Sequence, residues 1–189
     1  MIRIGILGDI GSGKSYVAKS FGYPVFNADR HVSELYKKNK KIFNKLKKAL
    51  PKYINKFPIN KIEISNAILD NELNLKKIVN IVHFEVRRKM KFFLEKNREK
   101  KVVILDIPLL LENKINNKDD ILIFVYSQKS KILKRLKKRK NFNMSIYHKF
   151  KKLQLPLDYK KKNSHFIIKN DFKKTSVRKQ IKNILRSII

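Results

Sequence analysis

The chain has 189 residues, no cysteine and no tryptophan, and it carries 47 Lys and Arg against 15 Asp and Glu, for a formal net charge of +32. This length predicts one domain with room for an inserted subdomain, and 42% hydrophobic residues suffice for a core, which excludes disorder of the whole chain. The missing cysteines exclude disulfides and thiolate metal sites, and the four histidines lack a metal-ligand spacing. Any metal would therefore be held by oxygen.

The strong positive charge has two interpretations. It suggests a polyanionic partner such as nucleic acid or an anionic membrane surface. The chain is also rich in Lys, Ile, Asn, Phe and Tyr, which share A/T-rich codons, and Lys outnumbers Arg about fourfold. Because no common nucleic-acid-binding motif is present, we interpret most of the excess charge as solvated composition and expect no dedicated nucleic-acid partner.

The sequence contains no apolar run near the roughly 20 residues of a membrane span. Its N-terminus also lacks the long apolar region and small-residue cleavage site of a signal peptide. We therefore expect a cytoplasmic protein without a membrane partner.

Strands and helices alternate along the chain. Apolar runs predict strands, and amphipathic stretches predict helices. The predicted strands are residues 2–7, 23–26, 101–106, 120–125 and 165–168, and the helical stretches are 14–21, 29–101, 129–162 and 175–189. Because the strands are continuously apolar, they favour a parallel sheet covered on both faces. The fold class is therefore α/β, with two helical appendages on the core.

A glycine-rich loop follows the first predicted strand and opens a helix. It fits G-x-x-x-x-G-K-[ST], whose backbone N–H groups curl around phosphate oxygens, and all five glycines of the chain fall within its first 22 residues. Lys14 would reach the β- and γ-phosphates of ATP, and Ser15 would ligate Mg²⁺. The predicted nucleotide-binding residues are Gly8, Asp9, Ile10, Gly11, Ser12, Gly13, Lys14 and Ser15.

The tetrapeptide Asn117-Lys118-Asp119-Asp120 matches N-K-x-D, the guanine-reading motif of GTPases. In a chain so rich in Asn and Lys this match has little weight, and it precedes a strand instead of following one. We interpret it as a loop.

Two carboxylates follow predicted strands at the sheet edge where parallel sheets bind ligands. Asp29 comes just after the second strand and is a candidate general base for an acceptor hydroxyl, or alternatively the N-cap of the next helix. Asp106 ends the third strand and is a candidate Mg²⁺ carboxylate together with Ser15, or alternatively a structural cap of the turn.

Two pairs of cations lie at helical spacing. Arg135 and Arg139 are four residues apart, and helical geometry predicts that Arg139 extends the buried stripe of its helix, where a guanidinium could stabilise charge in phosphoryl transfer. His83 and Arg87 flank the apolar stripe of the long helical stretch and could meet the acceptor. The alternatives are two solvated cations for the first pair and a partly buried structural histidine with a surface arginine for the second.

Together these motifs resemble the dephospho-coenzyme A kinase family, over about residues 2 to 170. The family pattern G-x-I-G-S-G-K-S corresponds to Gly8–Ser15, and D-A-D corresponds to Asn27–Asp29. The pattern H-P-x-V-R corresponds to His83–Arg87, and D-V-P-L-L-F-E corresponds to Asp106–Glu112. The pattern Q-x-P-x-x-x-K with a distal N corresponds to Gln154–Lys160 with Asn170.

The resemblance implies a P-loop fold of three α/β/α layers, with a parallel sheet of about five strands. The single domain 1–189 would carry a helical insertion that binds the acceptor, residues 28–98, and a lid, residues 139–162. The implied reaction transfers the γ-phosphoryl group of MgATP to the ribose 3′-hydroxyl of dephospho-coenzyme A, in a monomer. The implied catalytic residues are Asp29, Lys14 and Arg139; further nucleotide contacts are Arg135 and Asn170; further acceptor contacts are His83, Arg87, Asp106 and Leu109.

Several positions depart from the family pattern. Leu7 replaces a usual Thr, and Asp9 replaces a common Gly and brings an anion close to the phosphates. The remaining departures are Asn27 for Asp, Phe84 for Pro, Ile132 for Gln, and Ser164-His165 for Ala-Asp. Loss of one polar contact would weaken affinity by about 0.5–1.5 kcal/mol without removing the reaction.

Two other functions stay open at this point. The first is another small-molecule P-loop kinase, of the nucleotide or shikimate type. The second is a P-loop ATPase stimulated by nucleic acid, which the charge of +32 motivates.

Overall fold

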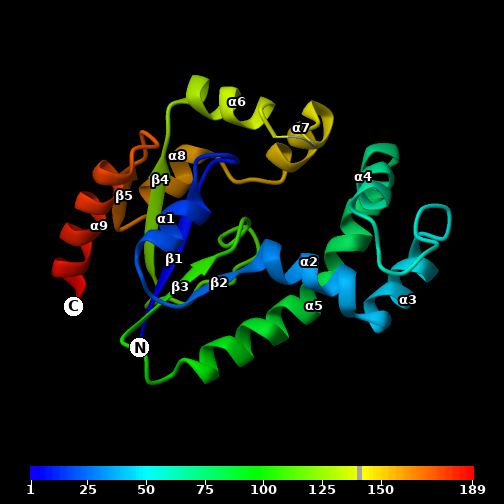
Figure 1. The fold of residues 1–189 in the computed structure, drawn as a ribbon, viewed down its shortest axis with the longest axis horizontal. Coiled ribbons are helices and arrows are strands. Elements are labelled where there is room, and N and C mark those ends of the chain that lie inside the picture. Colours follow the sequence, from blue (N-terminus) through cyan, green and yellow to red (C-terminus); the bar gives the residue numbers. More distant parts are fainter. Residues whose placement is uncertain (140–141) are drawn as a thin grey trace. The chain divides into compact units, whose positions relative to one another are not determined.

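The structure is a computed structural model that describes residues 1–139 and 142–189, and it contains a five-stranded parallel sheet (Figure 1). The strands are β1 (Ile2–Gly8), β2 (Val25–Asn27), β3 (Val102–Asp106), β4 (Ile121–Tyr126) and β5 (Phe166–Lys169). Their order is β2-β3-β1-β4-β5, and every neighbouring pair is parallel. The predicted parallel sheet is confirmed.

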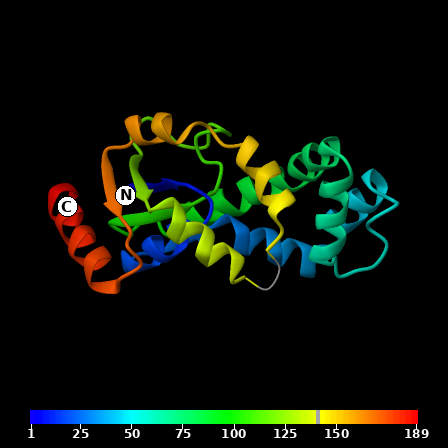
Figure 2. The ribbon, with the colours of Figure 1, turned by 90° about the horizontal axis from the view of Figure 1, so that it is seen from above.

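Helices α1 (Lys14–Ser20) and α9 (Lys174–Ile188) pack on each other and cover one face of the sheet. Their apolar side chains join Ile4 and Ile6 of β1 in one buried cluster, since alternate residues of a strand face the same side. Figures 1 and 2 show α9 alongside β5, the edge strand.

The opposite face of the sheet is covered by α8 (Leu157–Lys162), which contacts β1, and by the segment that follows β3. Leu110 of that segment and Leu122 of β4 lie so close to Gly5 that a Cβ there would be 2.5 Å and 2.9 Å from their Cδ2 atoms. Helix α6 (Lys129–Lys137) follows β4 and buries Ile132 and Leu136. The expected three layers are therefore present.

The chain divides into two compact units, which we describe separately. The first comprises Met1–Asn27, Asn97–Asn143 and Phe150–Ile189 and contains the sheet; the second comprises Ala28–Lys96 and Met144–Lys149. The second unit is helical. Its elements are α2 (Ala28–Lys38), α3 (Lys40–Ala49), α4 (Lys61–Asp70), α5 (Glu72–Lys96) and the first part of α7 (Met144–Lys152).

Helix α5 forms the core of the helical unit. It contacts α2, α3 and α4 through a buried stripe in which Leu75, Ile78, Val82 and Val86 recur at helical spacing. Two asparagine caps begin its partners: Asn39 accepts a hydrogen bond from the N–H of Ile42 at 3.0 Å in α3, and Asn60 forms a capping box in α4. The predicted helical stretch 29–101 is thus four helices, because it is interrupted at residue 39, at 50–60 and at residue 71.

The N-K-x-D tetrapeptide lies in the turn before β4, as predicted for a loop. Its Asp120 is buried, accepts from the backbone N–H of Asn117 at 2.9 Å, and pairs with Arg3 at 2.9 Å. Burial nevertheless raises the pKa of Asp120, against the opposing effects of that backbone N–H and of Arg3. The tetrapeptide therefore closes a turn before β4.

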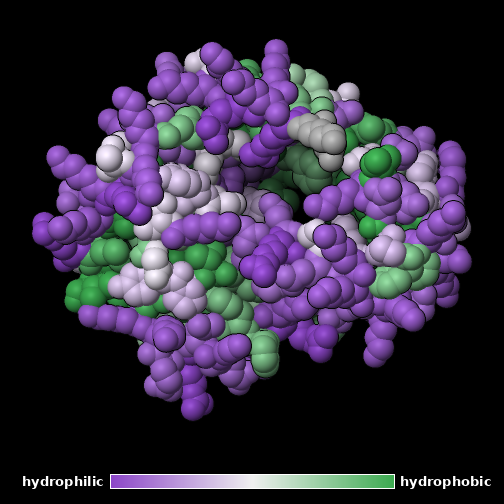
Figure 3. Space-filling model, in the orientation of Figure 1, coloured by the Kyte–Doolittle hydropathy of each residue, from purple (hydrophilic) through white to green (hydrophobic). Residues whose placement is uncertain are grey.

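Hydrophilic side chains dominate the surface in the view of Figure 3, as the excess of lysine predicts. Within residues 1–139 and 142–189, none of the helices has both the length and the apolar character needed to cross a membrane.

Candidate active site

The glycine-rich loop connects the end of β1 to the start of α1. Gly11 and Gly13 have φ angles of +83° and +91°, which L side chains rarely adopt. A Cβ at Gly13 would be 2.3 Å from the Asn170 side-chain nitrogen, and a Cβ at Gly11 would be 2.9 Å from the Leu136 Cγ. Conformation and space therefore both demand glycine, and α6 and the end of β5 pack directly against the loop.

Two buried side chains, Ser127 and Asn170, fix the loop by hydrogen bonds to its backbone. The Ser12 carbonyl accepts hydrogen bonds from Ser127 Oγ at 2.9 Å and from Asn170 Nδ2 at 2.8 Å, and Ser127 Oγ also lies 2.9 Å from the Asn170 carbonyl. Asn170, which the sequence pointed to as a nucleotide contact, is only 2% exposed. Ser127 was missed in the sequence analysis, since a lone serine after a strand carries no motif.

Lys14 and Ser15 open α1, as predicted. The Lys14 ammonium donates to the carbonyls of Gly8 at 3.2 Å and of Asp9 at 2.8 Å, which keeps it over the loop. Ser15 is exposed. The loop thus presents an ammonium, a hydroxyl and a helix N-terminus together, the combination that binds nucleotide phosphates.

Asp106 ends β3, and since β3 pairs in parallel with β1, its carboxylate lies at the sheet edge where the loop begins. It is 3% exposed, and Asn27 at the end of β2 donates its side-chain N–H to Asp106 Oδ2. Among the residues that the structure describes, no three His, Cys, Asp or Glu side chains gather into a metal site. The oxygen donors available are the Asp106 carboxylate and the Ser15 hydroxyl. They fit Mg²⁺, which takes one or two protein oxygens and completes its shell with phosphates and water.

The two arginines after β4 are both exposed. Arg135 lies over the ring of Phe172, with its Cζ 4.3 Å from the ring centre. The expectation that Arg139 extends the buried stripe of α6 is wrong, because α6 ends at Lys137 and Arg139 lies in the turn beyond it, where helical angles no longer apply. An exposed arginine there can still approach a bound substrate.

In the helical unit, Asp29 is the second residue of α2 and is exposed. The N-cap interpretation of Asp29 is wrong, since the helix already begins at Ala28. His83 and Arg87 share one side of α5, one turn apart, with His83 half-buried and Arg87 exposed. Burial, and secondarily the charge of Arg87, lowers the pKa of His83, so the imidazole is neutral at pH 7.

The segment after β3 carries the next predicted residue, Leu109, which is half-buried; its carbonyl accepts from the side chain of Asn113 at 3.0 Å. Glu112 has a role that the sequence motif alone did not reveal. Its Oε1 lies 2.6 Å from Lys160 Nζ and accepts from the backbone N–H of Leu155 at 3.0 Å. Lys160 is 1% exposed, so this ion pair ties α8 to the β3 segment inside the first unit.

The positions that depart from the family pattern have local explanations. Leu7 is buried in the sheet, Phe84 is 67% exposed on α5, and Ile132 packs against Gly11. His165 Nδ1 accepts from the backbone N–H of Leu122 at 3.0 Å, which extends the pairing of β4 and β5. Asp9 forms an ion pair with Lys151, with Oδ1 and Nζ 2.6 Å apart.

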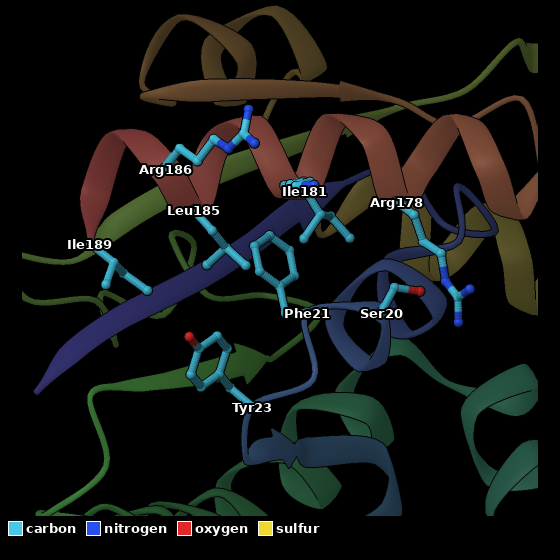
Figure 4. Close-up of a pocket in the computed structure, with 9 residues that line it drawn as sticks. Ser20, Phe21, Tyr23, Arg178, Ile181, Leu185, Arg186 and Ile189 are labelled. Atoms are coloured by element: carbon cyan, nitrogen blue, oxygen red, sulfur yellow. The ribbon is translucent and has the colours of Figure 1, made fainter.

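An open groove of about 440 Å³ lies between α9 and the end of α1 (Figure 4). In Figure 4 Phe21 points toward Ile181 and Leu185, and Arg178 extends toward Ser20. None of the predicted site residues lines this groove, so the groove is separate from the phosphate loop.

The chain is similar to known proteins of one family along nearly its whole length. The family model for dephospho-CoA kinase matches residues 2–176. A dephospho-CoA kinase from Wolbachia sp. subsp. Brugia malayi is 34% identical over 190 residues, which cover 98% of this chain and 97% of that protein. The crystal structure of TT1252 from Thermus thermophilus superposes with a TM-score of 0.80 at 26% identity and covers 100% of this chain and 98% of that one.

A dephospho-CoA kinase from Campylobacter jejuni shares the fold, with a TM-score of 0.62 at 22% identity over 98% of this chain and 96% of that one. The shared fold, the match along nearly the whole chain and the intact phosphate loop lead to one conclusion. This chain belongs to the dephospho-CoA kinase family.

Proposed function

We propose that this protein transfers the γ-phosphoryl group of ATP to the ribose 3′-hydroxyl of dephospho-CoA, the last step of coenzyme A synthesis. The observation that carries the proposal is the intact loop Gly8–Ser15 at the edge of a parallel sheet, in a chain that matches the family model over residues 2–176. The chemistry of each side chain and the family pattern support the role that we propose for it.

The loop residues Gly8 to Ser15 bind the nucleotide. Their N–H groups and the N-terminus of α1 bind the phosphates, and Lys14 neutralises charge on the β- and γ-phosphates. Ser15 and Asp106 hold Mg²⁺, which supplies charge neutralisation at the phosphate oxygens when it is bound. Asn170 supports the loop through the Ser12 carbonyl, so its effect on nucleotide affinity is indirect.

The insertion 28–98 binds the acceptor, and Asp106 and Leu109 are further acceptor contacts. Asp29 takes the proton of the ribose 3′-hydroxyl as that oxygen forms a bond to the γ-phosphorus. The bond between the γ-phosphorus and its bridging oxygen breaks, and ADP leaves with the electron pair. Neutral His83 and cationic Arg87 bind the acceptor, the first as a hydrogen-bonding group and the second as a partner for phosphate.

The segment 139–162 acts as the lid. Arg139 places a planar guanidinium against the charge of the transferring group, and Arg135 binds the nucleotide. Since both side chains are exposed in the ligand-free chain, substrate binding can recruit them without breaking a buried contact. We further propose that the enzyme acts as a monomer in the cytoplasm.

An acceptor panel tests this function. ADP formation is followed with MgATP and, in separate reactions, dephospho-CoA, AMP, shikimate, a nucleoside or RNA. We expect ADP release to depend on dephospho-CoA. Turnover that needs no acceptor, or that RNA accelerates, would instead favour the nucleic-acid-stimulated ATPase. Preference for another small alcohol would favour a different P-loop kinase.

A further inference from the structure

An acidic side chain lies in the phosphate loop itself. Asp9 is the second residue of the loop, and its side chain is only 13% exposed. Its Oδ1 accepts the backbone N–H of Ile10 at 2.7 Å, so the carboxylate occupies one of the loop's own backbone donors. A fixed negative charge at this point opposes the binding of a polyphosphate.

One lysine compensates that charge. Lys151, near the end of α7, places Nζ 2.6 Å from Asp9 Oδ1, and its side chain is 34% exposed. The ammonium of Lys14 also lies close by and donates to the carbonyls of Gly8 and Asp9, whereas Lys151 forms the ion pair with the Asp9 carboxylate. Because Asp9 is mostly shielded from water and Lys151 partly so, this pair is screened less than an ion pair between two exposed side chains.

We propose that Lys151 is a positioning residue for nucleotide binding, which acts through Asp9. It cancels the carboxylate inside the loop and couples the affinity for ATP to the docking of the end of α7. Removing Lys151 alone leaves an unpaired anion beside the phosphates, whereas removing both charges restores a neutral loop. The inference rests on the proposed function only in that the loop binds ATP; it does not depend on which acceptor is phosphorylated.

A double-mutant cycle tests the coupling. The dissociation constant of MgATP is measured by calorimetry, without acceptor, for the wild type, Lys151→Gln, Asp9→Asn and the double variant. Asp9→Asn keeps the size of the side chain and removes its charge. We expect Lys151→Gln to weaken ATP binding at least about tenfold, Asp9→Asn to bind ATP more tightly than the wild type, and the double variant to bind within about threefold of Asp9→Asn.

Two controls separate this effect from general charge or folding. Lys161→Gln removes an exposed lysine of α8, and we expect it to leave ATP affinity within about twofold of the wild type. Lys151→Arg keeps the charge and should bind ATP as the wild type does. Thermal unfolding of each variant establishes that it is folded.

The proposal is overturned if Lys151→Gln binds ATP normally, or if it loses the same affinity in the Asp9→Asn background as in the wild type. The second result would mean that Lys151 acts independently of Asp9. Because the cycle uses no acceptor, it can succeed even if dephospho-CoA proves not to be the substrate, and the two failures are distinguishable.

Discussion

At the scale of single residues, the phosphate loop is where sequence and structure agree most closely. Gly11 and Gly13 are needed both for their positive φ angles and for the close approach of Leu136 and Asn170. A motif with such strict backbone demands is readable from sequence, because few other residues can occupy those positions. The same reasoning cannot find Ser127 or Lys151, whose roles depend on partners more than 100 residues away in the chain.

Asp29 is the residue on which the proposed chemistry depends most. We expect Asp29→Asn to lower kcat by about 10²- to 10⁴-fold, since general-base catalysis contributes that much, with the dissociation constant of ATP unchanged. Steady-state kinetics with dephospho-CoA and calorimetry with ATP measure the two quantities.

A matched control for Asp29 is Asp158, another exposed carboxylate in the first turn of a helix. Asp158→Asn changes the same charge at the same kind of helix position, so any effect through the helix dipole alone is shared. If Asp29→Asn retains kcat within a few-fold of the wild type, or if both variants lose it equally, Asp29 is not the base.

At the scale of elements, the strands were predicted closely, while the helices were predicted as stretches without internal breaks. Continuous apolar runs identify buried strands, but the turns at 50–60 and the end of α6 at Lys137 have no glycine to mark them. This is why Arg139 was expected on a buried stripe. Pro51 and Pro58 and the N-caps Asn39 and Asn60 do mark breaks in the stretch 29–101, whereas neither glycine nor proline marks the end of α6.

The ion pair of Lys160 with Glu112 links α8 to the segment after β3. Lys160→Met would leave the Glu112 carboxylate buried and without its cation, and we expect the free energy of unfolding to fall by about 3–5 kcal/mol. Urea denaturation measures this, with Lys161→Met as the exposed control, expected within about 0.5 kcal/mol of the wild type. Equal effects at the two positions would show that the pair contributes nothing specific.

The half-buried His83 predicts a pH dependence of stability. Its pKa is lowered in the folded chain, so below its ordinary value of about 6.5 the unfolded chain binds the proton more tightly. The neutral His83 side chain therefore contributes to the free energy of unfolding above pH 6.5, and this contribution is lost as the pH falls through the lowered pKa of His83. We expect the free energy of unfolding to decline as the pH falls below about 6.5, and His83→Gln to flatten that decline in part, since the pKa of His31 is lowered too. An identical slope in the variant would contradict this assignment.

At the scale of the whole molecule, the charge of +32 gives less information about function than its size suggests. Figure 3 shows hydrophilic side chains over most of the face in view, which is the surface expected of a lysine-rich chain. The cations assigned to function are few: Lys14, Arg87, Arg135, Arg139 and Lys151. Function in this chain is carried by the placement of these side chains, because a diffuse positive surface attracts any polyanion and is screened by salt.

The most direct test of the account identifies the product. ATP labelled at the γ-phosphorus is incubated with the protein, Mg²⁺ and dephospho-CoA, and the labelled product is analysed by chromatography and fragmentation mass spectrometry. We expect one labelled coenzyme A per ADP formed, with the new phosphate on the ribose 3′-oxygen. Label recovered as inorganic phosphate, or on any other hydroxyl, would contradict it.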